Sequence, residues 1–66
     1  MRWDLIIKDL RNVLLLSQTE MAALLDVSFA TVNRWENNKN EPSIRIKRKI
    51  KELCIQNKID INAYNE

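Results

Sequence analysis

Residues 16–43 read LSQTEMAALLDVSFATVNRWENNKNEPS and contain the clearest structural pattern of the chain. Its polar breaks divide it into two short helices, expected at about 18–25 and 29–37. Ser17 and Glu20 have the spacing of a capping box, in which each side chain accepts a hydrogen bond from the backbone N–H of the other residue. The stretch therefore predicts two helices joined by a turn of three residues.

Further features of the stretch fit two helices that cross at a steep angle. Ala22 is small and stands where the two helix backbones must approach each other. Asp26 stands in the turn, where a positive φ is needed; glycine adopts this conformation most easily, and aspartate tolerates it. Ser28 is expected to cap the second helix. The crossing point is filled by apolar residues: Met21, Leu25, Val27, Val32 and Trp35. Together these features predict a helix-turn-helix over residues 18–37.

Helices are also expected on both sides of this motif. Apolar residues three and four positions apart predict a helix over about 4–14. After a polar loop, Ser43 is expected to cap a last helix over about 43–57, whose buried stripe is Ile46, Ile50, Leu53 and Cys54. The tail, residues 58–66, either packs onto the other helices or frays. The prediction is an all-α protein, a compact four- to five-helix bundle that forms a single domain over residues 1–66.

The composition of the 66-residue chain limits its chemistry. Histidine is absent, which removes the commonest general base and metal ligand. Glycine is absent too, which excludes a P-loop and a dinucleotide-binding fingerprint. We therefore expect no enzyme, no catalytic residue, no metal, no cofactor and no small-molecule substrate. The single cysteine, the lack of a signal-peptide pattern and the lack of a long apolar run predict a cytoplasmic protein without a membrane span.

Charge is distributed unevenly along the chain, although the net charge is only +2. Residues 28–51 contain seven basic and two acidic residues, whereas residues 1–27 contain three basic and four acidic ones. A basic run is more often a solvated helix face than a binding site. The pattern nevertheless suggests one positive face, of the kind that binds a polyanion.

The stretch 16–43 resembles the Cro/cI (XRE-type) helix-turn-helix family. The resemblance rests on "LSQ.E.A" at residues 16–22, "VS..TV.RWEN.K" at residues 27–39 and "PS" at residues 42–43. It covers about residues 5–57 and implies a lambda-repressor-like bundle whose third helix enters the major groove of double-stranded DNA. It also implies a transcriptional repressor or regulator of phage or bacterial type. Because one such module makes few base contacts, we expect a homodimer on a pseudo-palindromic operator.

The resemblance further implies roles for individual residues. Base edges would be contacted by Phe29, Ala30 and Arg34, and we expect Asn33, on the same outward side, to join them. The DNA backbone would be approached by Gln18, Ser28, Thr31, Asn37, Lys39 and Asn40. Gln18 would also brace the third helix, and Arg11 and Glu36 match a family pair that forms an internal salt bridge.

The side chains of the third helix suggest a half-site. Arg34 has the geometry to pair with O6 and N7 of guanine, which is worth about 1–3 kcal/mol of discrimination. Phe29 and Ala30 cannot hydrogen-bond a base, but they can contact a thymine methyl group. We therefore expect a half-site that combines a G·C pair with a T-rich position.

The chain departs from the family where glycine is usual, at Leu15, Asp26 and Asn38. Aspartate and asparagine tolerate a positive φ, whereas leucine does not, so we expect the connection between the first two helices to be reshaped. The apolar run at residues 13–15 either covers the tail or forms a self-association patch. Trp3 belongs either to the core or to a dimer contact.

A second function, from another class, is also compatible with the sequence. The chain could be a protein-interaction module, such as an antitoxin-like or control subunit whose apolar surface binds a partner protein. A strong dependence of DNA affinity on salt would favour the first function over this one.

Overall fold

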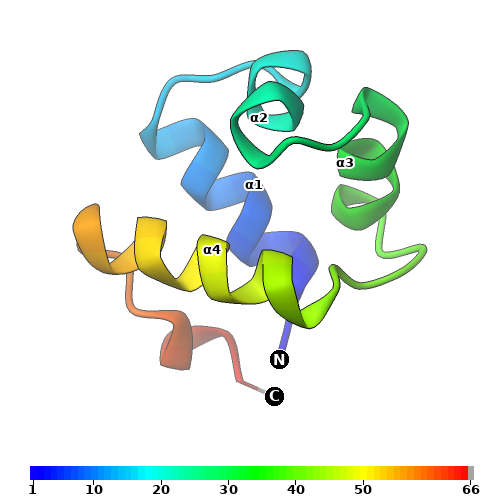
Figure 1. The fold of residues 1–66 in the computed structure, drawn as a ribbon. Coiled ribbons are helices and arrows are strands. Elements are labelled where there is room, and N and C mark those ends of the chain that lie inside the picture. The colour runs from blue at the N-terminus through cyan, green and yellow to red at the C-terminus, as the bar shows by residue number, and fades with distance from the viewer. Residues whose placement is uncertain (66) are drawn as a thin grey trace.

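The computed structural model describes residues 1–65 and contains helices without any strand in that part of the chain. Its elements are α1 (Trp3–Val13), α2 (Gln18–Leu25), α3 (Phe29–Glu36), α4 (Ile44–Gln56) and the short 3-10 helix η1 (Ile61–Tyr64). In Figure 1, α4 crosses in front of α1, α2 lies above α4, and α3 stands at the right of the molecule. The prediction of an all-α bundle is confirmed. No helix within residues 1–65 is long and apolar enough to cross a membrane.

Serine residues begin three of the helices. The Ser17 hydroxyl accepts from the Glu20 N–H at 3.1 Å, and the Ser17 N–H donates to the Glu20 carboxylate at 2.9 Å, so the capping box is confirmed. Ser28 caps α3 by accepting from the Thr31 N–H at 3.2 Å. Ser43 caps α4 in the same way. Each cap contributes about 1 kcal/mol, so these short helices begin at positions that the sequence determines locally.

The helix bounds differ from the predicted ones by single residues. Helix α2 matches its prediction, and α1 begins and ends one residue earlier than predicted. Helices α3 and α4 are shorter because Asn37, Ser43 and Asn57 lie at caps and not inside helices. Cap residues have only half of the helical hydrogen bonds and are easily assigned to either side of a boundary.

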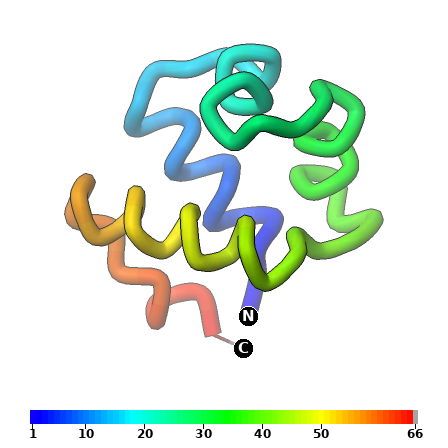
Figure 2. The backbone as a smooth tube through the Cα atoms, in the orientation of Figure 1, coloured from blue at the N-terminus to red at the C-terminus, as the bar shows by residue number. Residues whose placement is uncertain are grey.

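One hydrophobic core joins all four α-helices. The backbone trace in Figure 2 shows these helices arranged around the centre of the molecule. The buried members of the core are Ile6, Ile7, Leu10, Met21, Ala22, Leu25, Val32, Trp35, Ile46, Ile50 and Cys54. The predicted inward residues of the helix-turn-helix and of α4 are therefore confirmed, with Val27 and Leu53 only partly buried. This core determines which side of α3 is left for a ligand.

The tail packs and does not fray, as far as residue 65. Ile59, Ile61 and Tyr64 lie against the core. The Tyr64 hydroxyl donates to the Asp9 carboxylate at 2.6 Å, and the Tyr64 carbonyl accepts from the Arg2 N–H at 3.0 Å. The tail thereby connects the end of the chain to its beginning.

Trp3 lies partly buried at the edge of the core. The Lys47 ammonium stands 5.3 Å from the centre of its ring and also forms an ion pair with Glu41 at 2.9 Å. A cation over an indole ring adds a weak attraction to the burial of the ring. Of the two alternatives for Trp3, the structure supports packing within the chain.

The connection from α1 to α2 keeps a left-handed residue in spite of the leucine. Leu15 has φ of 57°, close to the values of Asp26 and Asn38, which are 56° and 57°. The expected reshaping is therefore wrong, because the backbone at Leu15 accepts the unfavourable conformation. Leu14 packs against the core, whereas Val13 and Leu15 are 53% and 88% exposed. These two side chains leave half or more of their surface to solvent.

Candidate nucleic-acid interface

Helix α3 has a buried side and an exposed side. Val32 and Trp35 enter the core, with exposed fractions of 0% and 4%. Phe29, Ala30 and Arg34 lie on the exposed side, as the spacing predicts. Phe29 is 51% exposed, which is unusual for a large aromatic side chain and leaves its ring available for an apolar contact.

Arg34 is available for a ligand. Its side chain is exposed and forms no hydrogen bond or ion pair within residues 1–65. Arginine presents five N–H donors in a planar arrangement that pairs with two acceptors side by side. The structure therefore places an unpartnered planar cation on the same exposed side of α3 as Phe29 and Ala30.

An ion pair joins α1 to the end of α3. Arg11 Nε lies 2.7 Å from Glu36 Oε2, and Arg11 Nη2 lies 3.0 Å from Glu36 Oε1. Arg11 also donates to the Leu16 carbonyl at 3.1 Å, so the same guanidinium holds the start of α2. Burial opposes ionisation of Glu36, but hydrogen bonds from Arg11 and Gln18 outweigh it and hold the pKa of the carboxyl below its ordinary value. The resemblance implied this pair, and the structure contains it.

Gln18 braces α3 at two points. Its Nε2 donates to Glu36 Oε1 at 3.1 Å, and its Oε1 accepts from Asn33 Nδ2 at 3.2 Å. Asn37 Nδ2 in turn donates to the Asn33 carbonyl at 2.8 Å and to Asn33 Oδ1 at 3.2 Å. A continuous polar network thus runs from Arg11 to Asn37 along the α2–α3 contact. It holds α3 at a set angle without using Arg34.

Asn33 differs from the other residues expected to contact bases. Its amide is partly buried and engaged by Gln18 and Asn37, whereas Arg34 is unpartnered. Sequence reasoning placed Asn33 on the outward side by its spacing and missed its contact with α2. A hydrogen bond between residues fifteen positions apart leaves no periodic signal in a sequence.

The residues expected at the DNA backbone lie around the two ends of α3. The Ser28 and Thr31 hydroxyls are 2.9 Å apart in its first turn. Asn37, Lys39 and Asn40 are exposed at its other end. The loop there is held by the Lys39 N–H, which donates to the Arg34 carbonyl at 2.9 Å. The Lys39 ammonium has no ion-pair partner in the described part of the chain.

Cations outside these predictions gather on α4. Arg45, Arg48 and Lys49 line a hollow between α4 and the end of α2. The sequence showed their charge but not this position, because it depends on how the two helices cross. Among residues 1–65, no group of three Cys, Asp or Glu side chains gathers in a way that could hold a metal ion.

Comparison with known families agrees with this geometry. A helix-turn-helix family matches residues 7–58, which include all of α2, α3 and α4 and most of α1. No curated protein and no solved structure matches the chain.

Proposed function

The chain belongs to the Cro/cI-like (XRE-type) helix-turn-helix family of DNA-binding regulators, and we propose that it is a sequence-specific repressor or regulator that places α3 in the major groove. The observation that carries the proposal is the outward side of α3. Phe29, Ala30 and the unpartnered Arg34 are exposed together there, while Gln18 braces the helix from behind. We assign the protein to the phage or bacterial type of such regulators.

Base readout is assigned mainly to Arg34. Its free guanidinium can pair with O6 and N7 of guanine, and this pairing discriminates between bases by about 1–3 kcal/mol. Phe29 and Ala30 supply apolar contacts to thymine methyl groups. Asn33 is proposed as a further base contact. Its side-chain amide has two N–H groups, and only one of them donates to Gln18, so the second can donate to a base.

Phosphate contacts are assigned to the polar groups around α3. Gln18 donates one amide N–H to Glu36, so its second N–H remains for a phosphate oxygen. Lys39 supplies a positive charge at the other end of the helix. The remaining proposed backbone contacts are Ser28, Thr31, Asn37 and Asn40. These contacts set the position of the protein on the duplex, whereas the base contacts supply the specificity.

Selection of bound sites from random duplex DNA tests the proposal. The bound sites should contain a common half-site with a guanine whose enrichment is lost in the Arg34→Ala variant. That variant should bind the selected site about 5- to 150-fold more weakly, the equivalent of 1–3 kcal/mol. Lys39→Ala should lower the affinity for all DNA sequences about equally. It should also reduce the slope of log affinity against log salt concentration by about one. Lys51→Ala, which removes an exposed cation of α4, is the matched control and should change neither.

The same experiment separates the proposal from the second function. Affinity for DNA should fall by orders of magnitude between about 50 and 200 mM salt if several phosphates are contacted. If neither Arg34→Ala nor Lys39→Ala changes the affinity for any duplex, the DNA-binding proposal fails. The interpretation as a protein-interaction module would then be favoured.

A further inference from the structure

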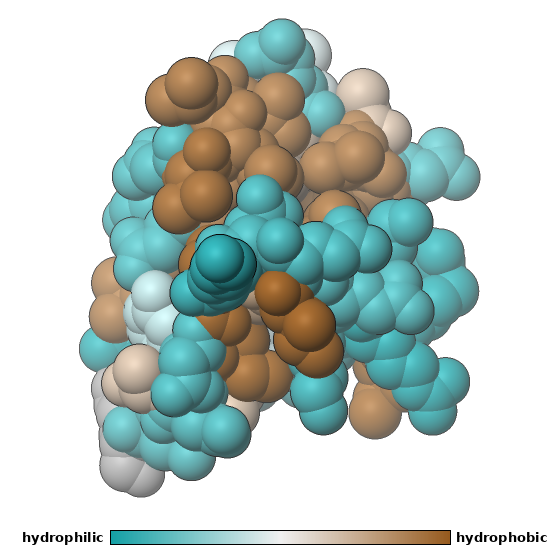
Figure 3. Space-filling model, turned by 90° about the vertical axis from the view of Figure 1, so that its left-hand side faces the viewer, coloured by the Kyte–Doolittle hydropathy of each residue, from teal (hydrophilic) through white to brown (hydrophobic). Residues whose placement is uncertain are grey.

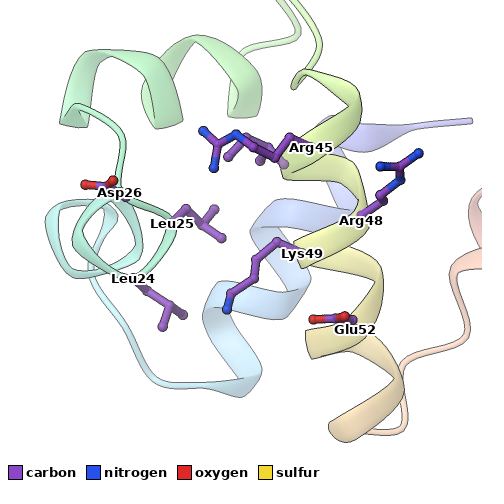
Figure 4. A pocket seen from close by; sticks show the side chains of 8 residues that line it. Leu24, Leu25, Asp26, Arg45, Arg48, Lys49 and Glu52 are labelled. Carbon is purple, nitrogen blue, oxygen red and sulfur yellow. The ribbon is translucent and has the colours of Figure 1, made fainter.

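A groove lies between the C-terminal end of α2 and the outer side of α4. It has a volume of about 330 Å³, and none of the residues proposed to contact DNA lines it. Leu24, Leu25 and Ile46 supply its apolar lining, and the charged lining residues are Asp26, Arg45, Arg48, Lys49 and Glu52. Figure 4 shows Arg45 and Lys49 extending from α4 toward α2, where Asp26 and Leu24 form the opposite wall.

The charged side chains of this groove are unpaired as far as residues 1–65 are concerned. None of the five forms an ion pair or a side-chain hydrogen bond within the part of the protein that the structure describes. Cations and carboxylates therefore line the same groove without neutralising each other. Both signs of charge are available to a partner.

This mixture of charges suits a second copy of the chain better than a polyanion. Duplex DNA in the groove would meet the carboxylates of Asp26 and Glu52 as well as the cations. A second copy related by a two-fold axis presents the same surface, so each sign can face its opposite in both directions. Along α4 the cations Arg45 and Lys49 come first and Glu52 follows. Two antiparallel α4 helices would therefore set Lys49 of each copy against Glu52 of the other.

Apolar surface beside the charges can supply the association energy. Exposed ion pairs contribute at most about 1 kcal/mol each, so they select an orientation but do not suffice for a dimer. Leu24 in the groove is 42% exposed, and Ile55, one turn beyond Glu52, is 67% exposed. Apolar side chains gather on the side of the molecule where the α1–α2 connection and the end of α4 lie (Figure 3).

We propose that two copies of this chain associate through the α2–α4 groove, with Lys49 of each copy facing Glu52 of the other. The inference rests on the proposed DNA-binding function, for which the family resemblance leads us to expect a homodimer, and it names the surface between the two copies. No residue of α3 lines the groove itself.

Exchange of charges between copies tests this interface. The variants are Lys49→Glu and Glu52→Lys, and both side chains are exposed, so the fold should be retained, as circular dichroism would check. Sedimentation velocity without DNA should show that the wild type dimerises with rising concentration. Each variant alone should associate at least about tenfold more weakly, because like charges then face each other. An equimolar mixture of the two should restore association to the wild-type level, as a heterodimer.

Lys51→Glu is the matched control, since it makes the same change on α4 at an exposed residue outside the groove. It should leave association unchanged. The proposal is overturned if the wild type stays monomeric, if the single variants associate as the wild type does, or if the mixture does not associate. It is also overturned if the variants leave association unchanged and alter only the affinity for DNA, so that Lys49→Glu binds DNA more weakly and Glu52→Lys binds it more tightly. That result would identify a phosphate contact.

The outcomes are distinct from those of the proposed function. If the association tests contradict the interface but the selected DNA half-site still depends on Arg34, the DNA-binding proposal is unaffected. A charge-dependent dimer that selects no DNA sequence supports the interface and contradicts the DNA-binding proposal.

Discussion

Single residues in this protein carry local costs that the rest of the fold tolerates, and Leu15 is the clearest case. It holds φ of 57° with its side chain 88% exposed, so packing offsets little of the unfavourable backbone. A left-handed conformation costs a residue with a Cβ about 1–2 kcal/mol, whereas glycine avoids this cost but gains entropy when unfolded. Leu15→Gly should therefore raise the free energy of unfolding by about 0.5–1 kcal/mol in urea denaturation.

Leu15→Ala is the control for this prediction. It removes the exposed side chain but keeps the Cβ, so it should change the stability by less than about 0.5 kcal/mol. Equal stabilisation by both variants would attribute the gain to the loss of exposed apolar surface and not to the backbone.

Tyr64 provides a second prediction for a single residue. The hydrogen bond to Asp9, with some burial and the negative charge of Asp9, raises the pKa of Tyr64 to about 12. The folded pKa lies above the ordinary value of 10, so the stability that this contact adds is complete below pH 10 and is lost as pH rises toward 12. Because Tyr64 is the one tyrosine of the sequence, ultraviolet absorbance can follow its ionisation alone. Asp9→Asn should move the midpoint back toward 10, and a wild-type midpoint near 10 would contradict the contact.

At the scale of the helices, the angle of α3 depends on the pair between Arg11 and Glu36. Glu36 is only 6% exposed, so Glu36→Gln leaves a largely buried guanidinium without its counterion. Loss of one partner from a buried pair costs about 3–5 kcal/mol, and we expect about 2–3 here because 19% of the Arg11 side chain is exposed. Thermal and urea unfolding measure the loss. The same change in the exposed pair of Lys47, Glu41→Gln, should cost less than about 1 kcal/mol.

The same pair predicts a dependence of stability on pH. The pKa of Glu36 is lower in the folded protein than its ordinary value of 4.5. Ionised Glu36 therefore stabilises the fold above about pH 4.5, and this contribution disappears as pH falls through the folded value. The difference in stability between wild type and Glu36→Gln should shrink over this range. A difference that stays constant down to strong acid would show that the charge of Glu36 is not what stabilises α3.

At the scale of the whole molecule, the proposed dimer predicts a rule for the operator. Two copies that present α3 on one face of a duplex need half-sites about one helical turn apart, near 10 base pairs from centre to centre. Insertion of about five base pairs turns one half-site to the opposite face, so affinity should fall toward that of a single half-site. Insertion of about ten base pairs returns both half-sites to the same face, so a flexible contact between the copies should restore part of the affinity. Electrophoretic mobility shift with these three duplexes measures the effect, and equal affinities would indicate that monomers bind independently.

Much of the fold can be predicted from the sequence, because the signals that position the helices are local. The serine caps, the capping box of Ser17 and Glu20 and the apolar spacing act within one or two helical turns. They determine where the helices begin and which side of each is buried, including the outward position of Arg34. The expected DNA-contacting residues on α3 follow from the same spacing together with the family resemblance.

The contacts that hold these helices together, and the hollow between them, become visible only in the folded molecule. The bonds from Gln18 to Asn33 and from Tyr64 to Asp9, and the hollow between α2 and α4, join residues far apart in the chain. Their existence depends on the crossing angles of packed helices, which no local spacing encodes. The left-handed Leu15 is a related case. Its own propensity argues against that conformation, and the packing of Leu14 and the hydrogen bonds of the turn outweigh it.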